Sequence, residues 1–292
     1  MFEGTHTALV TPFLRGRLDL PSFERLIREQ VKGGVDGIVP VGTTGESPTL
    51  SSEEHLAIIE AAVKHAGKKV KVIAGTGANS TSEAIHLTQG AEQLGADASL
   101  QVSPYYNKPS QEGLFQHFKA IARATKLPII LYSIPGRCNV SIAIETVVRL
   151  QKTCKNIVAI KEAGGDVDRV SQLKNALGPK FTILSGDDAL TIPFMSVGAK
   201  GVISVTSNLL PGDISRMVSR YRAGNHKGAL SIHERLYPVF KALFVETNPV
   251  PIKTAMALAG KIERGLRLPL TPMSKENELY LRKTLKAAKI KL

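Results

Sequence analysis

Cysteine is scarce in this sequence. Only Cys138 and Cys154 occur among its 292 residues. Two cysteines are too few for a disulfide framework or a cysteine-based metal cluster. The cysteine content therefore fits a reducing compartment, and we expect a cytoplasmic protein without a structural metal.

The sequence also lacks long hydrophobic runs, although 43% of its residues are hydrophobic. No stretch approaches the roughly 20 apolar residues that span a bilayer. The first residues, MFEG, do not form a basic region followed by an apolar run, so we expect no signal peptide. These two absences predict a protein without a membrane partner.

Negative charge is in short supply, since the formal net charge is +13. A strongly basic balance is typical of proteins that bind nucleic acid. Here, however, lysine and arginine are scattered along the chain and interleaved with acidic residues. The densest basic run, residues 282–291, has the pattern of the solvated face of a terminal helix. We expect no nucleic-acid partner, and only a general attraction for small anionic substrates.

Short apolar runs alternate with segments of helical periodicity, and this alternation predicts the fold. The runs recur at the spacing of one strand-helix unit, roughly 20–35 residues. Eight units in order predict an α/β fold, a (β/α)₈ TIM barrel. Helices are expected at 53–66, 82–94, 113–124 and 142–150, with Ser51 or Ser52 and Thr81 or Ser82 as N-caps. The expected strands are 6–11, 37–41, 70–74, 98–102, 128–132, 157–160, 181–184 and 201–205.

The last part of the chain has a helical pattern, no strand-like run and a break at Asn248-Pro249-Val250-Pro251. We predict a catalytic barrel over residues 1–224 and an appended C-terminal helical bundle over residues 225–292. Such helices either cover the barrel or build contacts between subunits, and the sequence does not decide between these roles.

Lys161 is the most informative residue. It follows the apolar run IVAI and precedes EAGG, a pattern typical of the end of a buried strand. Barrels of this kind carry their chemistry at the carboxyl ends of the strands. Burial disfavours the ammonium form, and a neutral lysine attacks carbonyl groups to form a Schiff base. The alternative is a lysine that merely extends into solvent.

Other predicted strand ends carry groups that suit the same chemistry. Thr43 and Thr44 lie in a glycine-flanked turn, GTTGES, which either binds a carboxylate or is a purely structural turn. Tyr132 is expected to point toward the barrel axis near Lys161, and Arg137 lies on the loop beyond it.

Later strand ends add further candidates. Gly186 and Ile203 can offer backbone groups to a ligand, whereas Asp187 and Asp188 are expected to have a capping or loop role rather than to bind a metal. Together with Lys161, the candidates predict an enzyme that acts on a 2-oxo acid through a lysine imine.

The motifs resemble those of the pyruvate-dependent class I aldolase family, which includes N-acetylneuraminate lyase. The resemblance covers nearly the whole chain. It implies condensation of pyruvate with L-aspartate-4-semialdehyde to 4-hydroxy-tetrahydrodipicolinate, on the route to lysine and diaminopimelate. It also implies a homotetramer of two tight dimers, with no metal or organic cofactor. The matching motifs are GTTGES (42–47), PYYN (104–107), Tyr132 with PGR (135–137), IKEA (160–163), LSGDD (184–188) and the Asn248-Pro249 segment.

The resemblance implies a role for each site residue. Lys161 forms the imine, and Tyr132 moves the proton through Thr44 to Tyr106, which enters from a neighbouring subunit. The loop of Thr43 and Thr44 holds the carboxylate of pyruvate. The carboxylate of the semialdehyde is implied to bind Arg137, while Gly186 and Ile203 line the site. The chain departs from the family at Ser133 and Cys138, where asparagine and threonine are often found.

A second site is implied by the same resemblance, because some family members bind L-lysine as an inhibitor at a subunit interface. Glu83 and Asn79 would hold the ammonium and carboxylate groups of lysine. The alternative is that Glu83 merely begins a helix, where a carboxylate is favourable anyway. The corresponding positions are Ser47, Pro48, His55, Asn79, Glu83 and Tyr105, and Ser52 replaces a histidine sometimes found there.

Two other functions remain open at this stage. One is a sibling enzyme with the same imine, such as N-acetylneuraminate lyase or a 2-keto-3-deoxy sugar-acid aldolase. The other is a non-catalytic barrel that senses a small oxo acid. Arg137 favours the semialdehyde over a sugar, and the joint presence of Lys161, Tyr132, Thr44 and Tyr106 argues against lost chemistry.

Overall fold

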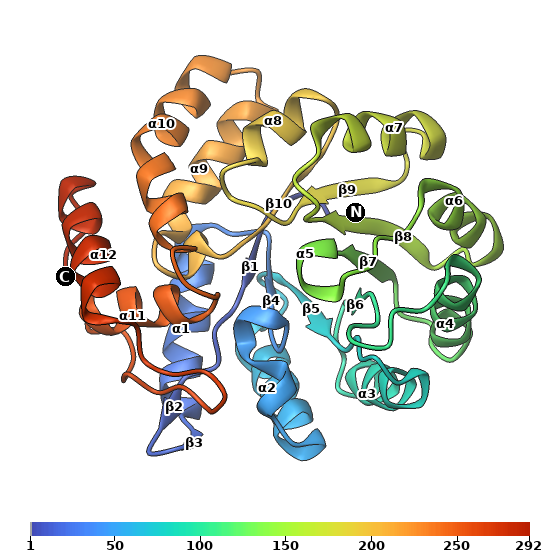
Figure 1. Ribbon diagram of the computed structural model, residues 1–292, viewed down its shortest axis with the longest axis horizontal. Coiled ribbons are helices and arrows are strands. Elements are labelled where there is room, and N and C mark those ends of the chain that lie inside the picture. Colours follow the sequence, from blue (N-terminus) through green and yellow to red (C-terminus); the bar gives the residue numbers. More distant parts are fainter. Residues whose placement is uncertain (1) are drawn as a thin grey trace.

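A computed structural model describes residues 2–292 and contains a closed barrel of parallel strands (Figure 1). Each strand pairs with the next strand of the barrel, and the last pairs with the first through Gly4 and Gly201. The predicted TIM barrel is confirmed. Its strands are β1 (Gly4–Ala8), β4 (Gly37–Val39), β5 (Lys71–Gly75), β6 (Ala98–Val102), β7 (Ile129–Ser133), β8 (Ile157–Glu162), β9 (Thr182–Ser185) and β10 (Gly201–Ser204).

The first strand differs from its prediction. β1 begins two residues before the expected start at His6 and ends at Ala8, before the expected Thr11. The chain then forms a small antiparallel hairpin, β2 (Phe13–Leu14) and β3 (Arg17–Leu18), that sequence periodicity did not predict. Strands of two residues are too short to establish a period of two.

Helices surround the barrel, and a short helix, α5 (Pro135–Cys138), lies over its centre in Figure 1. Ser51 caps α2 in a capping box with Glu54. For α3 the cap is Ser80, not Thr81 or Ser82, because its side chain accepts the amide of Glu83. The surrounding helices are α1 (Leu20–Gly33), α2 (Ser52–Ala66), α3 (Thr81–Gln93), α4 (Gln111–Arg123), α6 (Ile144–Thr153), α7 (Val167–Leu177), α8 (Thr191–Ser196) and α9 (Pro211–Arg222).

Three further helices, α10 (His226–Ala242), α11 (Val250–Leu258) and α12 (Lys275–Ala287), cover one side of the barrel (Figure 1). Ile252 and Leu281 belong to the same buried apolar cluster as Leu9 and Phe23 near the first strand. The C-terminal helices are therefore packed onto the barrel. The proposed boundary at residue 224 falls between α9 and α10.

The basic run at the end of the chain lies on α12 and beyond it. Lys283, Lys286 and Lys289 are exposed, whereas Leu281 and Leu285 are buried. This is the solvated helix face that the sequence predicts. Across the described residues, none of the helices is both long and apolar enough to cross a membrane.

Candidate active site

Lys161 and Tyr132 face each other near the carboxyl ends of β8 and β7. The two residues are partners in the strand register, so their side chains leave the same face of the sheet. The Lys161 ammonium nitrogen lies 4.0 Å from the centre of the Tyr132 ring, and both side chains are buried. The structure therefore brings the predicted nucleophile and the predicted acid/base into contact.

Burial changes the acid-base properties of Lys161. Desolvation lowers its pKa to about 7, and the positive charge of Arg137 acts in the same direction. The carboxylate of Asp188 opposes both effects. An amine with this pKa is partly uncharged at neutral pH, which is the state that attacks a carbonyl carbon.

The strand ends next to Lys161 leave space for its side chain. A Cβ atom on Gly186 would lie 3.1 Å from Cε of Lys161 and 2.7 Å from Cβ of Ala163, so glycine is needed there. Ile203 lies in the apolar cluster that also contains Tyr132.

Asp188 has the loop role that the sequence predicts. Its Oδ2 accepts hydrogen bonds from the amides of Val205 and Thr206 at 3.1 and 2.9 Å. Those bonds fix the segment that follows β10 and leave a buried carboxylate beside the amine of Lys161.

A cavity of about 190 Å³ lies beside Tyr132 at this end of the barrel. Thr43 and Arg137 both line it, so a hydroxyl and a guanidinium face the same space. Arg137 belongs to α5, and its Nη2 donates a 2.9 Å hydrogen bond to the backbone oxygen of Asn248. The wall consists of Val41, Gly42, Thr43, Ser47, Pro48, Gly75, Gly77, Leu100, Val102, Tyr105, Tyr132, Ile134, Arg137 and Cys138.

The two threonines of the GTTGES turn have different partners. Burial raises the pKa of Tyr132 to about 12, and a hydrogen bond to the Thr43 side chain acts in the opposite direction. The hydroxyl of Thr44 instead accepts a 3.0 Å hydrogen bond from the amide of Asn248. Among the described residues no hydrogen bond joins the side chains of Tyr132 and Thr44, so the proton path through Thr44 stays a prediction.

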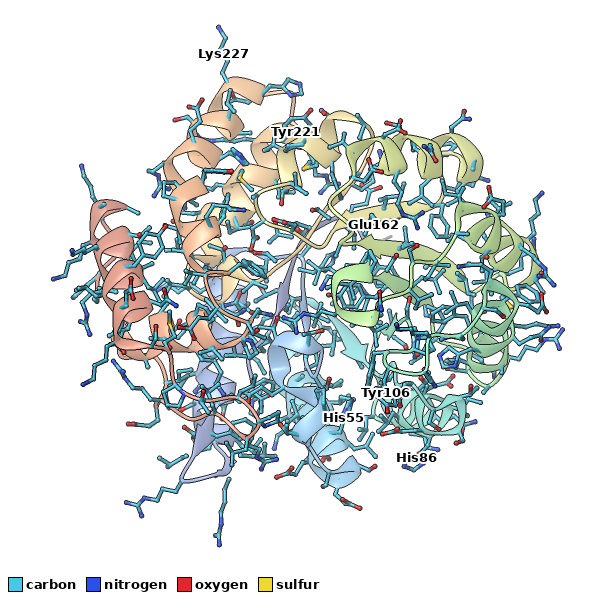
Figure 2. All side chains as sticks on the ribbon, viewed as in Figure 1. His55, His86, Tyr106, Glu162, Tyr221 and Lys227 are labelled. Atoms are coloured by element: carbon cyan, nitrogen blue, oxygen red, sulfur yellow. The ribbon has the colours of Figure 1, made fainter. Side chains whose placement is uncertain are left out.

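Tyr106 does not join the other site residues within one chain. Its side chain is 91% exposed, and its backbone has a φ of 73°. It lies on the loop after β6, near α3 (Figure 2). A role in catalysis would require another copy of the chain.

Most of the predicted effector residues surround a second cavity of about 270 Å³. Ser47, His55, Glu83 and Tyr105 line it, and the amide of Asn79 donates to the backbone oxygen of Tyr105 at 3.3 Å. Glu83 also lies in the first turn of α3. It therefore both lines the cavity and stands at the start of a helix, as the two interpretations of this residue require.

The second cavity shares a wall with the first and is lined by an uncharged histidine. Ser47, Pro48, Gly77 and Tyr105 line both cavities. Burial lowers the pKa of His55 to about 4, and its Nε2 lies within hydrogen-bonding distance, 2.8 Å, of the backbone oxygen of Gly75. Apart from Glu83, the cavity therefore presents mainly neutral groups.

The two departures from the family pattern lie close to the first cavity. Cys138 lines that cavity, and its thiol donates to the backbone oxygen of Ser103 at 3.1 Å. Burial raises the pKa of Cys138 to about 11, so the thiol stays protonated at neutral pH. Ser133 is buried, and its hydroxyl has no hydrogen-bond partner within residues 2–292.

Asn248 is the residue that sequence reasoning missed. It contacts Thr44 through its side chain and Arg137 through its backbone. The only sequence signal was the Asn248-Pro249 break, which indicates a helix end and says nothing about contacts with residues more than 100 positions earlier.

Comparisons with known proteins identify the family of this chain. The model of the dihydrodipicolinate synthetase family matches residues 1–288. A 4-hydroxy-tetrahydrodipicolinate synthase from Sulfurihydrogenibium sp. is 54% identical over 98% of each chain. The structure of this synthase from Methylacidiphilum fumariolicum is 56% identical, with a TM-score of 0.98 over 99% of this chain and 96% of that one. The Cyanidioschyzon merolae structure with lysine bound is 44% identical, with a TM-score of 0.96 over 99% of both chains. The chain belongs to the dihydrodipicolinate synthetase family.

Proposed function

We propose that this protein condenses pyruvate with L-aspartate-4-semialdehyde to 4-hydroxy-tetrahydrodipicolinate, through an imine on Lys161. The observation that carries the proposal is the buried Lys161 amine, with its pKa lowered to about 7, in contact with Tyr132. Relatives of this chain bear the name of that synthase. Among the functions left open by the sequence, the sibling lyases and a non-catalytic sensor have no comparable support.

The first half of the reaction activates pyruvate. The neutral amine of Lys161 attacks C2 of pyruvate, and loss of water gives the iminium. The iminium withdraws electrons from the neighbouring methyl group, which loses a proton and becomes an enamine. Tyr132 is protonated at neutral pH because its pKa is about 12, so it can donate and recover protons in these steps.

The second half forms the carbon-carbon bond. The enamine carbon attacks the aldehyde carbon of the semialdehyde, and the aldehyde oxygen takes a proton to become the hydroxyl group. The amine of the semialdehyde then attacks C2 and displaces Lys161, which closes the ring. One water molecule is released for each pair of substrates, so Lys161 is regenerated without hydrolysis.

Each of the two substrates carries a carboxylate, and the site offers a separate group to bind each one. Thr43 and Thr44 begin a 3₁₀ turn, Thr43–Gly45, and residues that begin a helical turn leave their amides unpaired within it. We assign the carboxylate of pyruvate to that turn and the carboxylate of the semialdehyde to Arg137, whose planar fork suits a carboxylate. Thr44, which follows Thr43 in that turn, is assigned to the proton path from Tyr132 to Tyr106.

The test is a pair of assays on the purified protein. Consumption of pyruvate that depends on L-aspartate-4-semialdehyde is expected, whereas N-acetylneuraminate should not be cleaved. Cleavage of the sugar acid without condensation would overturn the assignment in favour of the lyase.

Assembly is part of the same proposal. Tyr106 is 91% exposed in one chain, which is unusual for a large side chain implied to act in catalysis. We assign Tyr106 to the proton path of a neighbouring subunit in a tight dimer, with two dimers forming a homotetramer. Sedimentation velocity should give the tetramer mass, and a monomer with full activity would refute this assignment.

The substrates and the free thiols of Cys138 and Cys154 support a cytoplasmic location.

L-Lysine is the proposed ligand of the second cavity. The Cyanidioschyzon merolae relative has been crystallised with lysine bound, and here Glu83 supplies a carboxylate for an ammonium group. Because the two cavities share a wall, lysine bound in one would constrain the other. Initial rates should fall as lysine is added, and a flat response up to millimolar lysine would remove this assignment.

A further inference from the structure

The turn that carries Thr43 and Thr44 has a backbone that is costly to maintain. Val41, just before it, has a φ of 50°, and Glu46, just after it, has a φ of 55°. Non-glycine residues seldom adopt this left-handed region, and a β-branched residue such as valine does so least readily. Strained backbone of this kind persists only where surrounding contacts hold it.

The side chain of Glu46 provides such a contact, and it points away from the cavity. It is fully buried and does not line the first cavity. Its Oε1 lies 2.5 Å from the amine of Lys253 on α11, and its Oε2 accepts the amide of Arg267 at 3.1 Å. The same lysine donates to the backbone oxygen of Thr11 at 2.8 Å.

The Lys253–Glu46 ion pair is almost completely enclosed, since the two side chains are 2% and 0% exposed. Burial lowers the pKa of Lys253, and the charge of Glu46 opposes that change. Two charges removed from water are costly unless both are paired and hydrogen-bonded. The presence of this enclosed pair therefore favours a role in fixing local geometry in addition to stability.

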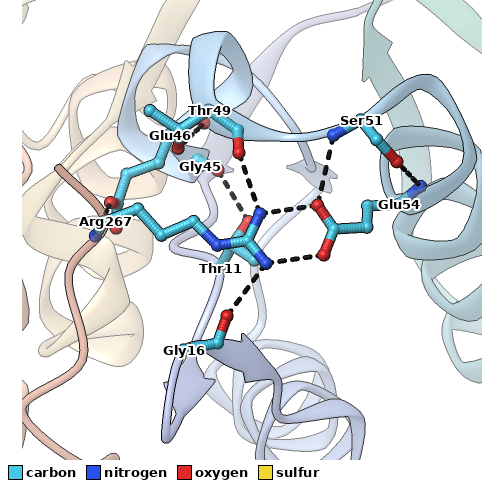
Figure 3. A network of polar contacts seen from close by, with 8 residues as sticks. All are labelled: Thr11, Gly16, Gly45, Glu46, Thr49, Ser51, Glu54 and Arg267. Atoms are coloured by element: carbon cyan, nitrogen blue, oxygen red, sulfur yellow. Dashed lines mark hydrogen bonds and ion pairs between the residues drawn. The ribbon is translucent and has the colours of Figure 1, made fainter.

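Two more contacts join the C-terminal helices to the same part of the barrel. The amide of Asn248 donates to the hydroxyl of Thr44 at 3.0 Å. The guanidinium of Arg267 donates to the backbone oxygen of Thr49 at 2.8 Å and to both carboxylate oxygens of Glu54 (Figure 3). Residues 44–54 are thus held at several points by residues 248–267.

We propose that Lys253 and Asn248 are positioning residues, which fix the carboxylate-binding turn of residues 43–46 through Glu46 and Thr44. Neither residue lines the first cavity, so each acts through the turn. The inference rests on the pyruvate site proposed above. The proposal gives the C-terminal helices an indirect part in pyruvate binding, through the turn of residues 43–46.

The test measures the pyruvate concentration that gives half-maximal borohydride trapping, together with kcat. In the Glu46→Gln/Lys253→Met double variant, which leaves no unpaired buried charge, half-saturation should rise at least roughly tenfold while kcat at saturating pyruvate falls less than about threefold. Asn248→Ala removes one hydrogen bond and no charge, and it should shift half-saturation in the same direction. A Lys253→Arg single variant keeps Glu46 and a positive charge at position 253. Its affinity for pyruvate should therefore lie between that of the double variant and that of the wild type.

The matched control is Arg264→Gln, which breaks an exposed ion pair with Glu278 on α12 and does not touch the turn. Its half-saturation should equal that of the wild type. A folded double variant that binds pyruvate as the wild type does, with only a lower Tm, would overturn the proposal. If the double variant does not fold, unchanged half-saturation in Asn248→Ala would overturn it instead. Absence of trapping in the wild type would contradict the proposed function itself.

Discussion

Formation of the pyruvate imine should rise with pH around an inflection near 7, because Lys161 must lose its proton before it attacks. A fall in the pKa of Lys161 from 10.5 to about 7 corresponds to roughly 5 kcal/mol at 1.36 kcal/mol per pH unit. At pH 7 about half of the Lys161 amine is then uncharged, compared with roughly one in 3,000 for an ordinary lysine. The carboxylate of pyruvate stays ionised over this range, so the inflection reports the enzyme.

The assay measures initial rates of imine formation from about pH 5 to about pH 11, a range that covers both the expected inflection and that of an ordinary lysine. Each reaction is stopped in borohydride at one fixed pH. The fraction of protein that carries the reduced pyruvate adduct is then measured by intact-protein mass spectrometry. An inflection near 10 would show that Lys161 titrates as an ordinary exposed lysine and would refute the argument from burial.

Two substitutions test how neighbouring charges shift the pKa of Lys161, and the two shifts should have opposite signs. Arg137 adds positive charge near Lys161, so Arg137→Ala should move the inflection to higher pH. Asp188 supplies a negative charge that favours the ammonium, so Asp188→Asn should move the inflection to lower pH. Shifts in the same direction, or no shift in either variant, would show that these two charges do not influence the pKa of Lys161 as described.

Three further predictions concern the second substrate, the subunit partner and the effector. Arg137→Ala should keep pyruvate trapping at high pH but lose condensation by roughly a hundredfold or more, as expected for a lost charge-assisted contact; equal loss of both activities would show that Arg137 is structural. Tyr106→Phe and Lys161→Ala should each be nearly inactive, yet mixed dimers should regain activity, because one of their two sites then has both side chains intact; failure of a demonstrated mixed dimer to regain activity would place Tyr106 outside the neighbour's site. Glu83→Gln should weaken inhibition by lysine at least roughly tenfold with unchanged KM for pyruvate, and full inhibition in this variant would remove Glu83 from the effector site.

The barrel and its central pair of residues follow from the sequence for clear physical reasons. Strands buried on both faces leave short apolar runs, and a parallel barrel brings all their carboxyl ends to one face. Lys161 and Tyr132 were therefore predicted to meet from their positions alone. The capping residue of α3 was missed because Ser80, Thr81 and Ser82 all have hydroxyls, and only the backbone geometry selects one.

Contacts between distant segments left no such signal. Lys253 and Glu46 are 207 residues apart, and neither interrupts the periodicity of its own segment. The hydrogen bond between Asn248 and Thr44 likewise leaves no sequence signal, because the direction of a side chain in a tight turn depends on backbone angles. Tyr106 is the opposite case, since its exposure in one chain is what the proposed second chain would explain.

Identification of the lysine that reacts with pyruvate tests the central claim most directly. Borohydride reduction in the presence of pyruvate, followed by peptide mass mapping, should place one stable adduct on Lys161. The buried Lys253, which also has a lowered pKa, should remain unmodified because its amine is paired with Glu46 and bonded to the backbone oxygen of Thr11. An adduct on any other lysine, or no adduct, would contradict the imine mechanism.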